Sequence, residues 1–451
     1  MNISNTEEEK FYEQFRRKDS YRINPKEVAK LNRPFSVMGK IGSVLFMAVC
    51  ILVIWRFTAR TEQWYFLGGI MFVYLLIKEV LALCYVPCKK KLTKEYKVSC
   101  VITCYNENPE SIVSIFKNIL ALDYSPYEVI FLDDGSKDTT AYEVAKSFAE
   151  SHHDVPGAPI FNIVRFDENR GKRELLIDAF GRAGGDYIFL LDSDSEILPN
   201  ALTELLRPFE DGKTTSCVGN IGILNKDKNF LTRLQSISYF GSFQLGRAAQ
   251  SVTGDVVICS GAFSLHKKDF IMQNLEEFKR CTFLGVDVSA GDDRSLTAFS
   301  KMSGGKTRYQ NTAYCETLVP TTWKKFQSQR RRWQRSAYIT SLKTVHDLFP
   351  KKLWYLFWSF GESYFWLIAK MIFLSTLFSS GIYIDIVDIF LFFIIVMYKH
   401  NTFYLLYRPI RFLFIPVYFF AYGLSLTYTR IHAAITIKND DWGTRGGNKK
   451  K

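Results

Sequence analysis

Cysteine is scarce in this sequence, and its placement argues against two common ways of stabilising a small domain. The 451 residues contain nine cysteines, an odd number that forms no set of paired CxxC motifs. Structural zinc sites usually use such pairs, and disulfide frameworks are typical of small secreted domains. We therefore expect a reducing environment around the central part of the chain. Cysteines inside apolar runs are predicted to be buried small hydrophobic side chains: Cys50, Cys84, Cys100, Cys104 and Cys259.

We also expect no N-terminal signal peptide, and acidic residues are not in excess. The first 33 residues are strongly charged and contain no apolar core. Lysine and arginine outnumber aspartate and glutamate by 58 to 45, and the net charge of +13 suits contact with anionic lipid, with an acidic polymer, or with both. With 47% hydrophobic residues the chain is too apolar to be disordered. Its 38 Phe and 24 Tyr gather in a few stretches, so we expect a membrane part beside a soluble part.

Two apolar stretches near the N-terminus have the length of about 17 to 25 residues that a helix needs to cross a membrane. They cover 41–57 and 64–86 and are predicted to form a helical hairpin. Basic residues flank it on both sides, which by the positive-inside rule places both of its ends in the cytosol. Lys78 and Glu79, late in the second stretch, fit snorkelling or a local pair near the inner interface as well as they fit the polar lining of a channel.

Three further apolar blocks, 353–378, 382–398 and 410–428, follow in the C-terminal part. If all three crossed the membrane, the basic tail would lie outside, against the positive-inside rule. We expect the last block to lie in the interface, because Pro416 interrupts it and it is rich in tyrosine, which is favoured at headgroup level. Residues 321–360 interleave Trp with Lys and Arg, and they are expected to form amphipathic helices on the inner leaflet rather than a nucleic-acid surface.

Between the two membrane parts the chain reads as an α/β domain. Short apolar strands are predicted over 98–105, 128–132, 161–164 and 187–191, and amphipathic stretches separate them. This alternation is typical of a mostly parallel, Rossmann-like sheet. Ligands of such sheets bind beyond the carboxyl ends of the strands, so the residues after each strand are the candidate site.

Those residues are mostly acidic or polar. Tyr105 and Glu107 follow the first strand, residues 133–136 (Asp-Asp-Gly-Ser) the second, and Asp192 and Asp194 the fourth. Each cluster alone also suits a turn or a helix cap. Three clusters at successive strand ends favour a shared crevice, in which Asp192 and Asp194 are predicted to hold Mg2+ or Mn2+ bound to a diphosphate.

Basic and acidic residues elsewhere complete the predicted site. Lys172 and Arg173 follow the third strand and are candidates to neutralise phosphate oxygens, although exposed charge is an equal alternative. Asp292 and Asp293 are candidates for a general base that takes the proton of an acceptor hydroxyl. Further on, residues 329–333 (Gln-Arg-Arg-Arg-Trp) offer hydrogen-bond donors and a flat ring on which a sugar could lie.

The ordered motifs are Asp133-Asp134-Gly135-Ser136, Asp192-Ser193-Asp194, Gly291-Asp292-Asp293-Arg294 and Gln329-x-x-Arg332-Trp333. With membrane segments on both sides, this set resembles the processive family 2 glycosyltransferases, membrane enzymes that polymerise sugars from UDP-sugars and pass the polymer through their own channel. The resemblance extends over about 41–448. Within that family the chain is most similar to the single-chain, class I hyaluronan synthases, through 170–174, 291–297 and the tail Asp441-Trp442-Gly443-Thr444-Arg445.

The resemblance implies an architecture. An α/β GT-A-like catalytic domain would be inserted between transmembrane helices of a multi-pass protein of the cell membrane, with that domain and both termini in the cytosol. The expected parts are a cytosolic segment 1–36, two transmembrane helices in 37–88, the catalytic domain 89–320, interfacial helices 321–352, C-terminal transmembrane and interfacial helices 353–430, and a gating tail 431–451.

The resemblance also implies roles for single residues. UDP-sugar contacts would come from Tyr105, Glu107, Asp134, Lys172, Arg173, Asp192, Trp442 and Arg445. Asp194, with Asp192, would hold the metal, and Asp293, beside Asp292, would be the catalytic base. The acceptor would lie against Ser260, Gly261, Gln329, Arg332 and Trp333.

The implied activity is inverting polymerisation of UDP-GlcNAc and UDP-GlcA into hyaluronan, since no motif offers a nucleophile for a covalent intermediate. Partners would be these donors, the growing polysaccharide and membrane lipid, with no nucleic acid and no obligatory protein. The chain departs from the family pattern at Ala262, where a proline is usual, and at Ser328, where a glutamine is usual. Both lie near the acceptor, so chitin, chitin-oligosaccharide and other capsule synthases remain alternatives, as does a non-catalytic channel regulated by a nucleotide.

Overall fold

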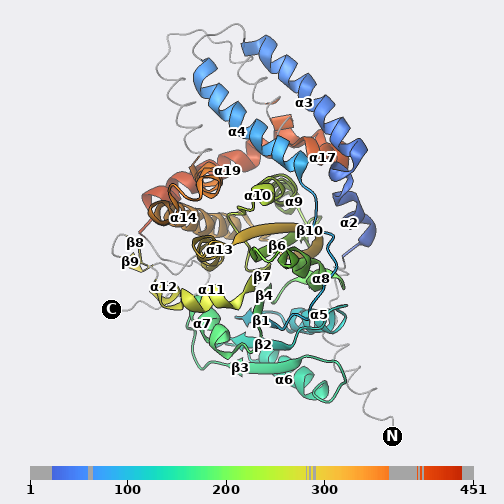
Figure 1. Cartoon of the computed structure of the whole chain (residues 1–451), viewed down its shortest axis with the longest axis vertical. Helices are drawn as coiled ribbons and strands as arrows, with labels where there is room; N and C mark the ends of the chain where they lie inside the picture. Colours follow the sequence, from blue (N-terminus) through green and yellow to red (C-terminus); the bar gives the residue numbers. More distant parts are fainter. Residues whose placement is uncertain are drawn as a thin grey trace.

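The computed structural model of the chain describes residues 23–58, 64–280, 282–283, 286–287, 291–364, 394, 397–398 and 401–438. Its centre is an eight-stranded sheet in the order β3-β2-β1-β4-β7-β6-β10-β5 (Figure 1). The strands of this sheet are β1 Val98–Cys104, β2 Glu128–Asp133, β3 Ile160–Arg165, β4 Tyr187–Asp192, β5 Glu196–Ile197, β6 Thr214–Ile223, β7 Phe263–Lys267 and β10 Lys306–Thr317. A separate small hairpin pairs β8 Thr282–Phe283 with β9 Val286–Asp287.

The sheet is mixed. Strands β3, β2, β1 and β4 are parallel, and they confirm the four predicted strands to within about two residues. Strand β7 runs antiparallel to both β4 and β6, and β5 runs antiparallel to β10, whereas β10 and β6 are parallel. The sequence predicted only the first half of this arrangement.

Helices cover both faces of the sheet. The helices of the α/β domain are α5 Pro109–Leu120, α6 Thr140–Ser151, α7 Lys172–Arg182, α8 Ala201–Leu206, α9 Phe230–Phe240, the π-helix η3 Gly241–Arg247, α10 Ala248–Thr253, α11 Lys268–Gln273, α12 Leu275–Lys279 and α13 Asp292–Met302, with a 3-10 turn η2 Arg207–Asp211. Alternate residues of β1 enter different cores, as a strand covered on both faces requires. Cys100 and Ile102 pack with the side of α5 and α6, and Val101 packs with the side of α7 and α13.

The N-terminal helices are α2 Pro25–Leu31, the 3-10 turn η1 Arg33–Phe35, α3 Val37–Thr58 and α4 Trp64–Cys84. Helix α2 lies beside the sheet near β10, and α3 and α4 project away from it (Figure 1). The predicted hairpin is thus helical at the expected positions. In the part of the chain that the structure describes, no single helix is both long and apolar enough to qualify as a membrane span. The pair Lys26–Phe35 and Val37–Leu52, bent by 58°, meets the length and composition test only when the two are taken together.

The C-terminal part contains α14 Trp323–Leu348, α17 Thr402–Tyr407, α18 Pro409–Phe412 and α19 Ile415–Ile435. A helical stretch over 353–364 is also described, but most of the predicted blocks 353–378 and 382–398 lies outside the described residues. The break between α18 and α19 lies where Pro416 was predicted to interrupt the last block, because proline is tolerated in the first turn of a helix but not in its interior. Helix α19 lies along α14, and Arg335 Nη2 donates a hydrogen bond to Thr436 Oγ1 at 2.7 Å.

Candidate active site

The loops after β1 and β2 are joined by hydrogen bonds of one asparagine. The Asn106 backbone N–H donates to Ser136 Oγ at 2.8 Å, and Asn106 Oδ1 accepts from the Lys137 N–H at 2.9 Å. Two residues later, Asn108 caps α5 by accepting the Glu110 N–H at 3.1 Å. Tyr105 and Glu107 are half-buried in this turn. The turn therefore places both predicted nucleotide contacts beside the β2 loop.

Two buried carboxylates organise the loops after β2 and β3. Asp133 pairs with Arg165 at 3.3 Å and accepts a hydrogen bond from Ser136 Oγ. Asp134 accepts the backbone N–H groups of Arg170 at 2.7 Å and Gly171 at 3.1 Å. Both aspartates are completely buried. Asp134 therefore holds the loop that leads into α7, and its predicted contact with uridine stays a prediction.

Helix α7 begins at Lys172, whose ammonium group lies beside the acidic end of β4. Lys172 Nζ is 2.7 Å from Asp192 Oδ1, and the two side chains are 22% and 34% exposed. A Cβ atom on Gly261 would lie 3.9 Å from the same Nζ. The structure thus brings together three predicted parts of the site: Lys172, expected to bind phosphate oxygens, Asp192, expected to hold the metal, and the loop with Gly261, expected to contact the acceptor. Because both charged groups reach solvent, a ligand can take the place of either group as the partner of the other.

Asp192 and Asp194 supply carboxylate oxygens at the end of β4. Thr317 Oγ1 donates to Asp194 Oδ1 at 3.0 Å, and the Asp192 N–H donates to the Ala262 carbonyl oxygen at 3.3 Å. No group of three or more His, Cys, Asp or Glu side chains able to hold a metal lies within the described residues. Two carboxylates completed by phosphate and water oxygens are the set that Mg2+ commonly uses. The site therefore fits a divalent cation bound together with a diphosphate.

Arg173 and Asp292 form a buried ion pair that joins α7 to α13. Arg173 Nε lies 2.7 Å from Asp292 Oδ1, and both side chains are 8% exposed. The Arg173 guanidinium also lies 5.2 Å from the centre of the Phe278 ring. This geometry gives both residues a positioning task. Their predicted roles as nucleotide contact and catalytic carboxylate stay predictions.

Asp293 is half-buried at the start of α13. Burial raises the pKa of Asp293, and the charge of Asp292 adds to this effect, while Arg294 and Lys172 oppose it. A raised pKa makes a carboxylate a better proton acceptor near neutral pH. Thr297 Oγ1 donates to the Asp293 carbonyl oxygen at 2.7 Å and accepts the Cys259 N–H at 2.9 Å. Thr297 thereby ties the loop containing Ser260 to the predicted base.

Helix α14 meets the N-terminus of α13 at a glycine. Gly291 has a φ of +95°, and a Cβ atom there would lie 1.9 Å from Ser336 Oγ. Residues 329, 332, 333 and 336 lie on adjoining rows of α14, since helix neighbours are three or four residues apart. The predicted acceptor residues Gln329, Arg332 and Trp333 therefore lie on the same side of α14 as Ser336, and their acceptor role stays a prediction.

The side chains on this part of α14 have solvent access or unused hydrogen-bonding capacity. Trp333 is 37% exposed, and the Arg330 guanidinium lies 4.5 Å from its ring centre. Gln329 Oε1 is buried and accepts no hydrogen bond from the residues that the structure describes. An oxygen in this state is suited to accept a hydrogen bond from a ligand.

The sequence prediction missed residues that organise the site without a motif of their own, above all Arg165 and Thr317. Each lies near the end of a strand and acts through a partner that only the sheet order brings close. Thr297 ends the stretch 291–297 that carries the resemblance, but no role for it follows from the sequence. Trp442 and Arg445 lie outside the described residues.

Comparisons with known proteins match this chain to glycosyltransferases. The chain matches the family "Glycosyl transferase family 2" over residues 99–275. It is 35% identical over 406 residues to a hyaluronan synthase of Streptococcus pyogenes, covering 89% of this chain and 96% of that protein. It is 28% identical over 354 residues to an N-acetylglucosaminyltransferase of Azorhizobium caulinodans, covering 77% of this chain and 87% of that protein.

A solved structure supports the fold. The mannosyltransferase of Pyrobaculum calidifontis, in complex with GDP-Man and Mn2+, matches with a TM-score of 0.56 at 19% identity, over 89% of this chain and 100% of that chain. At this identity the match shows the α/β GT-A-like fold alone. The similarity to the hyaluronan synthase extends over most of both proteins. The chain is therefore a glycosyltransferase and belongs to the processive family 2 glycosyltransferases, the family that includes the hyaluronan synthases.

Proposed function

We propose that the protein polymerises UDP-GlcNAc and UDP-GlcA into hyaluronan, with inversion at each transfer, and moves the polymer across the membrane. The observation that carries the proposal is the meeting of Lys172, Asp192 and the Ser260–Gly261 loop next to Asp293. Donor, cation and acceptor functions would share one crevice at the carboxyl ends of the strands. The similarity to a hyaluronan synthase over 89% of the chain supports the choice of polymer.

Donor binding would replace the contact between Lys172 and Asp192. The Lys172 ammonium would pair with diphosphate oxygens, while Asp192 and Asp194 would hold Mg2+ or Mn2+. When bound, this cation would supply charge neutralisation to the leaving diphosphate. Tyr105, Glu107 and Asp134 lie at the ends of β1 and β2 and would frame the uridine. Arg173 would act through Asp292, and Trp442 and Arg445 would close over the nucleotide.

The transfer step requires one proton acceptor and one leaving group. Asp293 would take the proton from the acceptor hydroxyl, whose oxygen then bonds to the anomeric carbon as the bond to UDP breaks. The partly buried position and raised pKa of Asp293 suit this task. A single displacement of this kind inverts the configuration at that carbon. Gln329, Arg332 and Trp333 would bind the end of the acceptor sugar chain.

The membrane role is supported by the N-terminal hairpin. Helix α3 exposes large apolar side chains, whose contact with water is unfavourable. They are Val37, Met38, Ile41, Val44, Leu45, Val49 and Leu52. We propose that α3, α4 and the C-terminal helices lie in or on the cell membrane, with the catalytic domain and both termini in the cytosol. Lys78 pairs with Glu362 at 2.5 Å and lies buried, which favours a polar contact between helices over snorkelling.

Polymer synthesis by purified protein tests the proposal. The protein in detergent receives Mg2+ or Mn2+ and radiolabelled UDP-GlcNAc, UDP-GlcA, or both. We expect high-mass product only with both donors, digestible by hyaluronidase and lost when the cation is chelated. Polymer from UDP-GlcNAc alone would contradict the hyaluronan assignment and support the chitin-like alternative, which is consistent with the similarity to an N-acetylglucosaminyltransferase. No product with any donor would contradict the proposal and favour a nucleotide-regulated channel.

A further inference from the structure

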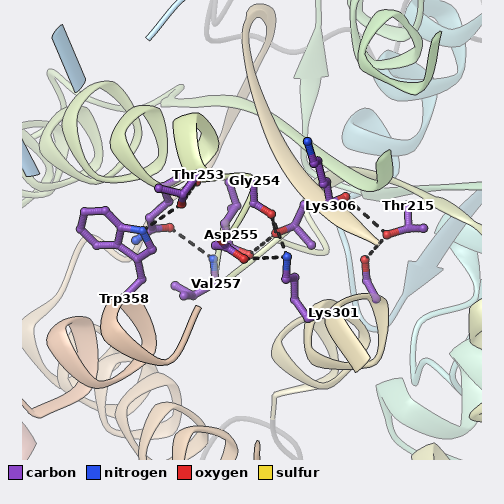
Figure 2. A network of polar contacts seen from close by, with 12 residues as sticks. Thr215, Thr253, Gly254, Asp255, Val257, Lys301, Lys306 and Trp358 are labelled. Atoms are coloured by element: carbon purple, nitrogen blue, oxygen red, sulfur yellow. Dashed lines mark hydrogen bonds and ion pairs between the residues drawn. The ribbon is translucent and has the colours of Figure 1, made fainter. Parts of the chain in front are cut away.

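A buried ion pair links α13 to the loop that leads to the predicted acceptor pocket. Lys301 Nζ lies 2.6 Å from Asp255 Oδ1 and donates a hydrogen bond to the Gly254 carbonyl oxygen at 2.9 Å (Figure 2). The two side chains are only 3% and 9% exposed. Charges buried to this extent depend on their partner, so the pair fixes the distance between the two segments.

Lys301 lies on the same face of α13 as the residues of the transfer site. Positions 293, 297 and 301 are four residues apart, so their side chains follow one another along one side of the helix. Asp293 is the proposed base, and Thr297 Oγ1 accepts the Cys259 N–H at 2.9 Å. Lys301, one turn further on, holds Asp255. One helical face thus carries the base and two attachment points.

The segment from Asp255 to Cys259 is attached to α13 at both of its ends. The Val256 and Val257 side chains between them are buried, at 0% and 4% exposure. Ser260 and Gly261 follow immediately after the second attachment, at the place where Lys172 and Asp192 meet. A displacement of Asp255 along α13 would therefore be passed on to the acceptor loop.

The start of this segment is fixed from the other side by the C-terminal part of the chain. Trp358 is completely buried, and its Nε1–H donates to Thr253 Oγ1 at 3.2 Å (Figure 2). Thr253 ends α10 directly before Gly254, which has a φ of +78°. The chain at 253–255 is therefore held from two sides, by Lys301 of α13 at Asp255 and by Trp358 of the helical stretch 353–364 at Thr253.

We propose that Lys301 and Asp255 are positioning residues for glycosyl transfer: their pair sets where Ser260 and Gly261 lie relative to Asp293, and hence how the acceptor hydroxyl meets the base. The inference rests on the proposed function. Lys172 and Asp192, the proposed donor site, pair with each other, whereas Lys301 pairs with Asp255. A misplacement of about 1 Å near reacting groups can cost about 100-fold in rate, so the pair affects transfer far more than donor binding.

The test replaces the pair in the full-length protein. Lys301→Met is expected to lower kcat for polymer formation by about 10-fold to 100-fold while KM for each UDP-sugar and the directly measured UDP affinity change by less than about 2-fold. Lys301→Arg, which can restore the ion pair, is expected to recover part of the lost kcat. The matched control is Ser300→Ala on the same turn, because Ser300 Oγ bonds Thr215 Oγ1 at 2.6 Å, away from the acceptor loop. This control is expected to keep kcat.

The outcomes separate this inference from the proposed function. No polymer from the wild-type protein would contradict the proposed function itself. With an active wild type, an unchanged kcat in Lys301→Met would overturn the positioning role. An equal loss in Ser300→Ala, or a UDP affinity that falls together with kcat, would assign the pair a general role in stability and also overturn it. If Lys301→Met does not fold, Asp255→Asn is measured instead, and a wild-type kcat there would overturn the inference.

Discussion

At the scale of single residues, five aspartates of the motifs fall into two groups, and Asp293 stands apart from both. Asp133, Asp134 and Asp292 are buried and bonded to backbone N–H groups or arginines of the protein. Asp192 and Asp194 are only half-buried and have a lysine and a threonine as partners, which a ligand can replace. We therefore expect the first group to hold the loops in place and the second group to bind ligand. The motifs alone do not separate the two, because the residue type is the same.

Asp293 gives the first prediction. Asp293→Asn removes the proton acceptor with little change in shape, and we expect polymer formation to fall by about 100-fold to 10,000-fold. Burial raises the pKa of Asp293 above its ordinary value of 3.8, so wild-type kcat should decline as the pH falls through that raised pKa and the base becomes protonated. Initial rates of sugar incorporation between pH 5 and pH 8 measure both effects.

UDP affinity, measured by calorimetry, is the control for Asp293→Asn. It should stay within about 2-fold of wild type, because Asp293 is not among the proposed donor contacts. Unchanged synthesis in this variant would contradict the assignment of the base. A loss of UDP binding together with synthesis would show instead that Asp293 is needed for the folded donor site.

His266 gives a prediction about stability. It is completely buried in β7, with Ser216 Oγ 2.8 Å from Nδ1 and Ser264 Oγ 2.9 Å from Nε2. Burial lowers the pKa of His266 to about 3, against 6.5 when unfolded. Below about pH 6.5 the unfolded state therefore binds a proton that the folded state does not bind. The free energy of unfolding consequently declines as the pH falls below that value.

From pH 7 to pH 5, this single group should reduce the free energy of unfolding by about 2 kcal/mol. His266→Gln should remove that share of the pH dependence, whatever its effect on stability at pH 7. Thermal unfolding followed by Trp fluorescence at both pH values measures it. His153→Gln, at a side chain that is 82% exposed, is the matched control. Identical pH dependence in wild type and His266→Gln would contradict the prediction.

At the scale of elements, the contact between α13 and α14 joins the proposed base to the helix that carries the proposed acceptor residues. Gly291→Ala is expected to lower both stability and transfer, because the φ of +95° disfavours a side chain and the new Cβ would lie 1.9 Å from Ser336 Oγ. Gly304→Ala is the control, since it has a φ of +85° with no atom within 4 Å of the added Cβ. The control should lose only the cost of the left-handed conformation, about 1–2 kcal/mol.

Unfolding free energies and polymer rates of the two variants measure the difference. Gly291→Ala should be less stable than Gly304→Ala by about 1–3 kcal/mol, the usual cost of overpacking, and only Gly291→Ala should lose activity. Equal behaviour of the two would show that α13 and α14 adjust freely at their contact.

The elements that local patterns specify were the predictable ones. Strands β1 to β4 combine apolar runs with turn residues at their ends, so their positions and the acidic clusters after them follow from the sequence. The antiparallel strand β7 could not be predicted in this way, because its pairing with β4 and β6 depends on the path of the preceding helices α9, η3 and α10. Contacts such as Asp134 with the Gly171 N–H, or Lys301 with Asp255, join distant segments and have no local signal.

At the scale of the whole molecule, the N-terminal hairpin and the catalytic domain are joined at an irregularity of β10. The register of β10 against β6 shifts between Gln310 and Tyr314, which leaves backbone groups free to bond elsewhere. Directly after α4, Tyr85 OH donates to the Tyr309 carbonyl oxygen at 3.0 Å and accepts the Asn311 N–H at 3.0 Å. The Cys88 N–H donates to Gln310 Oε1 at 3.0 Å. The shift thus creates the attachment point for the hairpin.

Tyr85→Phe tests this attachment. The change leaves the Asn311 N–H without its buried partner and the Tyr309 carbonyl with only the 3.4 Å hydrogen bond from Ser251 Oγ, which should cost about 1–3 kcal/mol of unfolding free energy. Hydrogen exchange should accelerate at residues 85–88 and 309–311 together. Tyr124→Phe is the matched control, because the Tyr124 hydroxyl also bonds two backbone groups, both of Tyr96, within the catalytic domain. If Tyr85→Phe changes exchange no more at these two segments than Tyr124→Phe does, the hairpin is held to the sheet by its apolar contacts and the hydroxyl is dispensable.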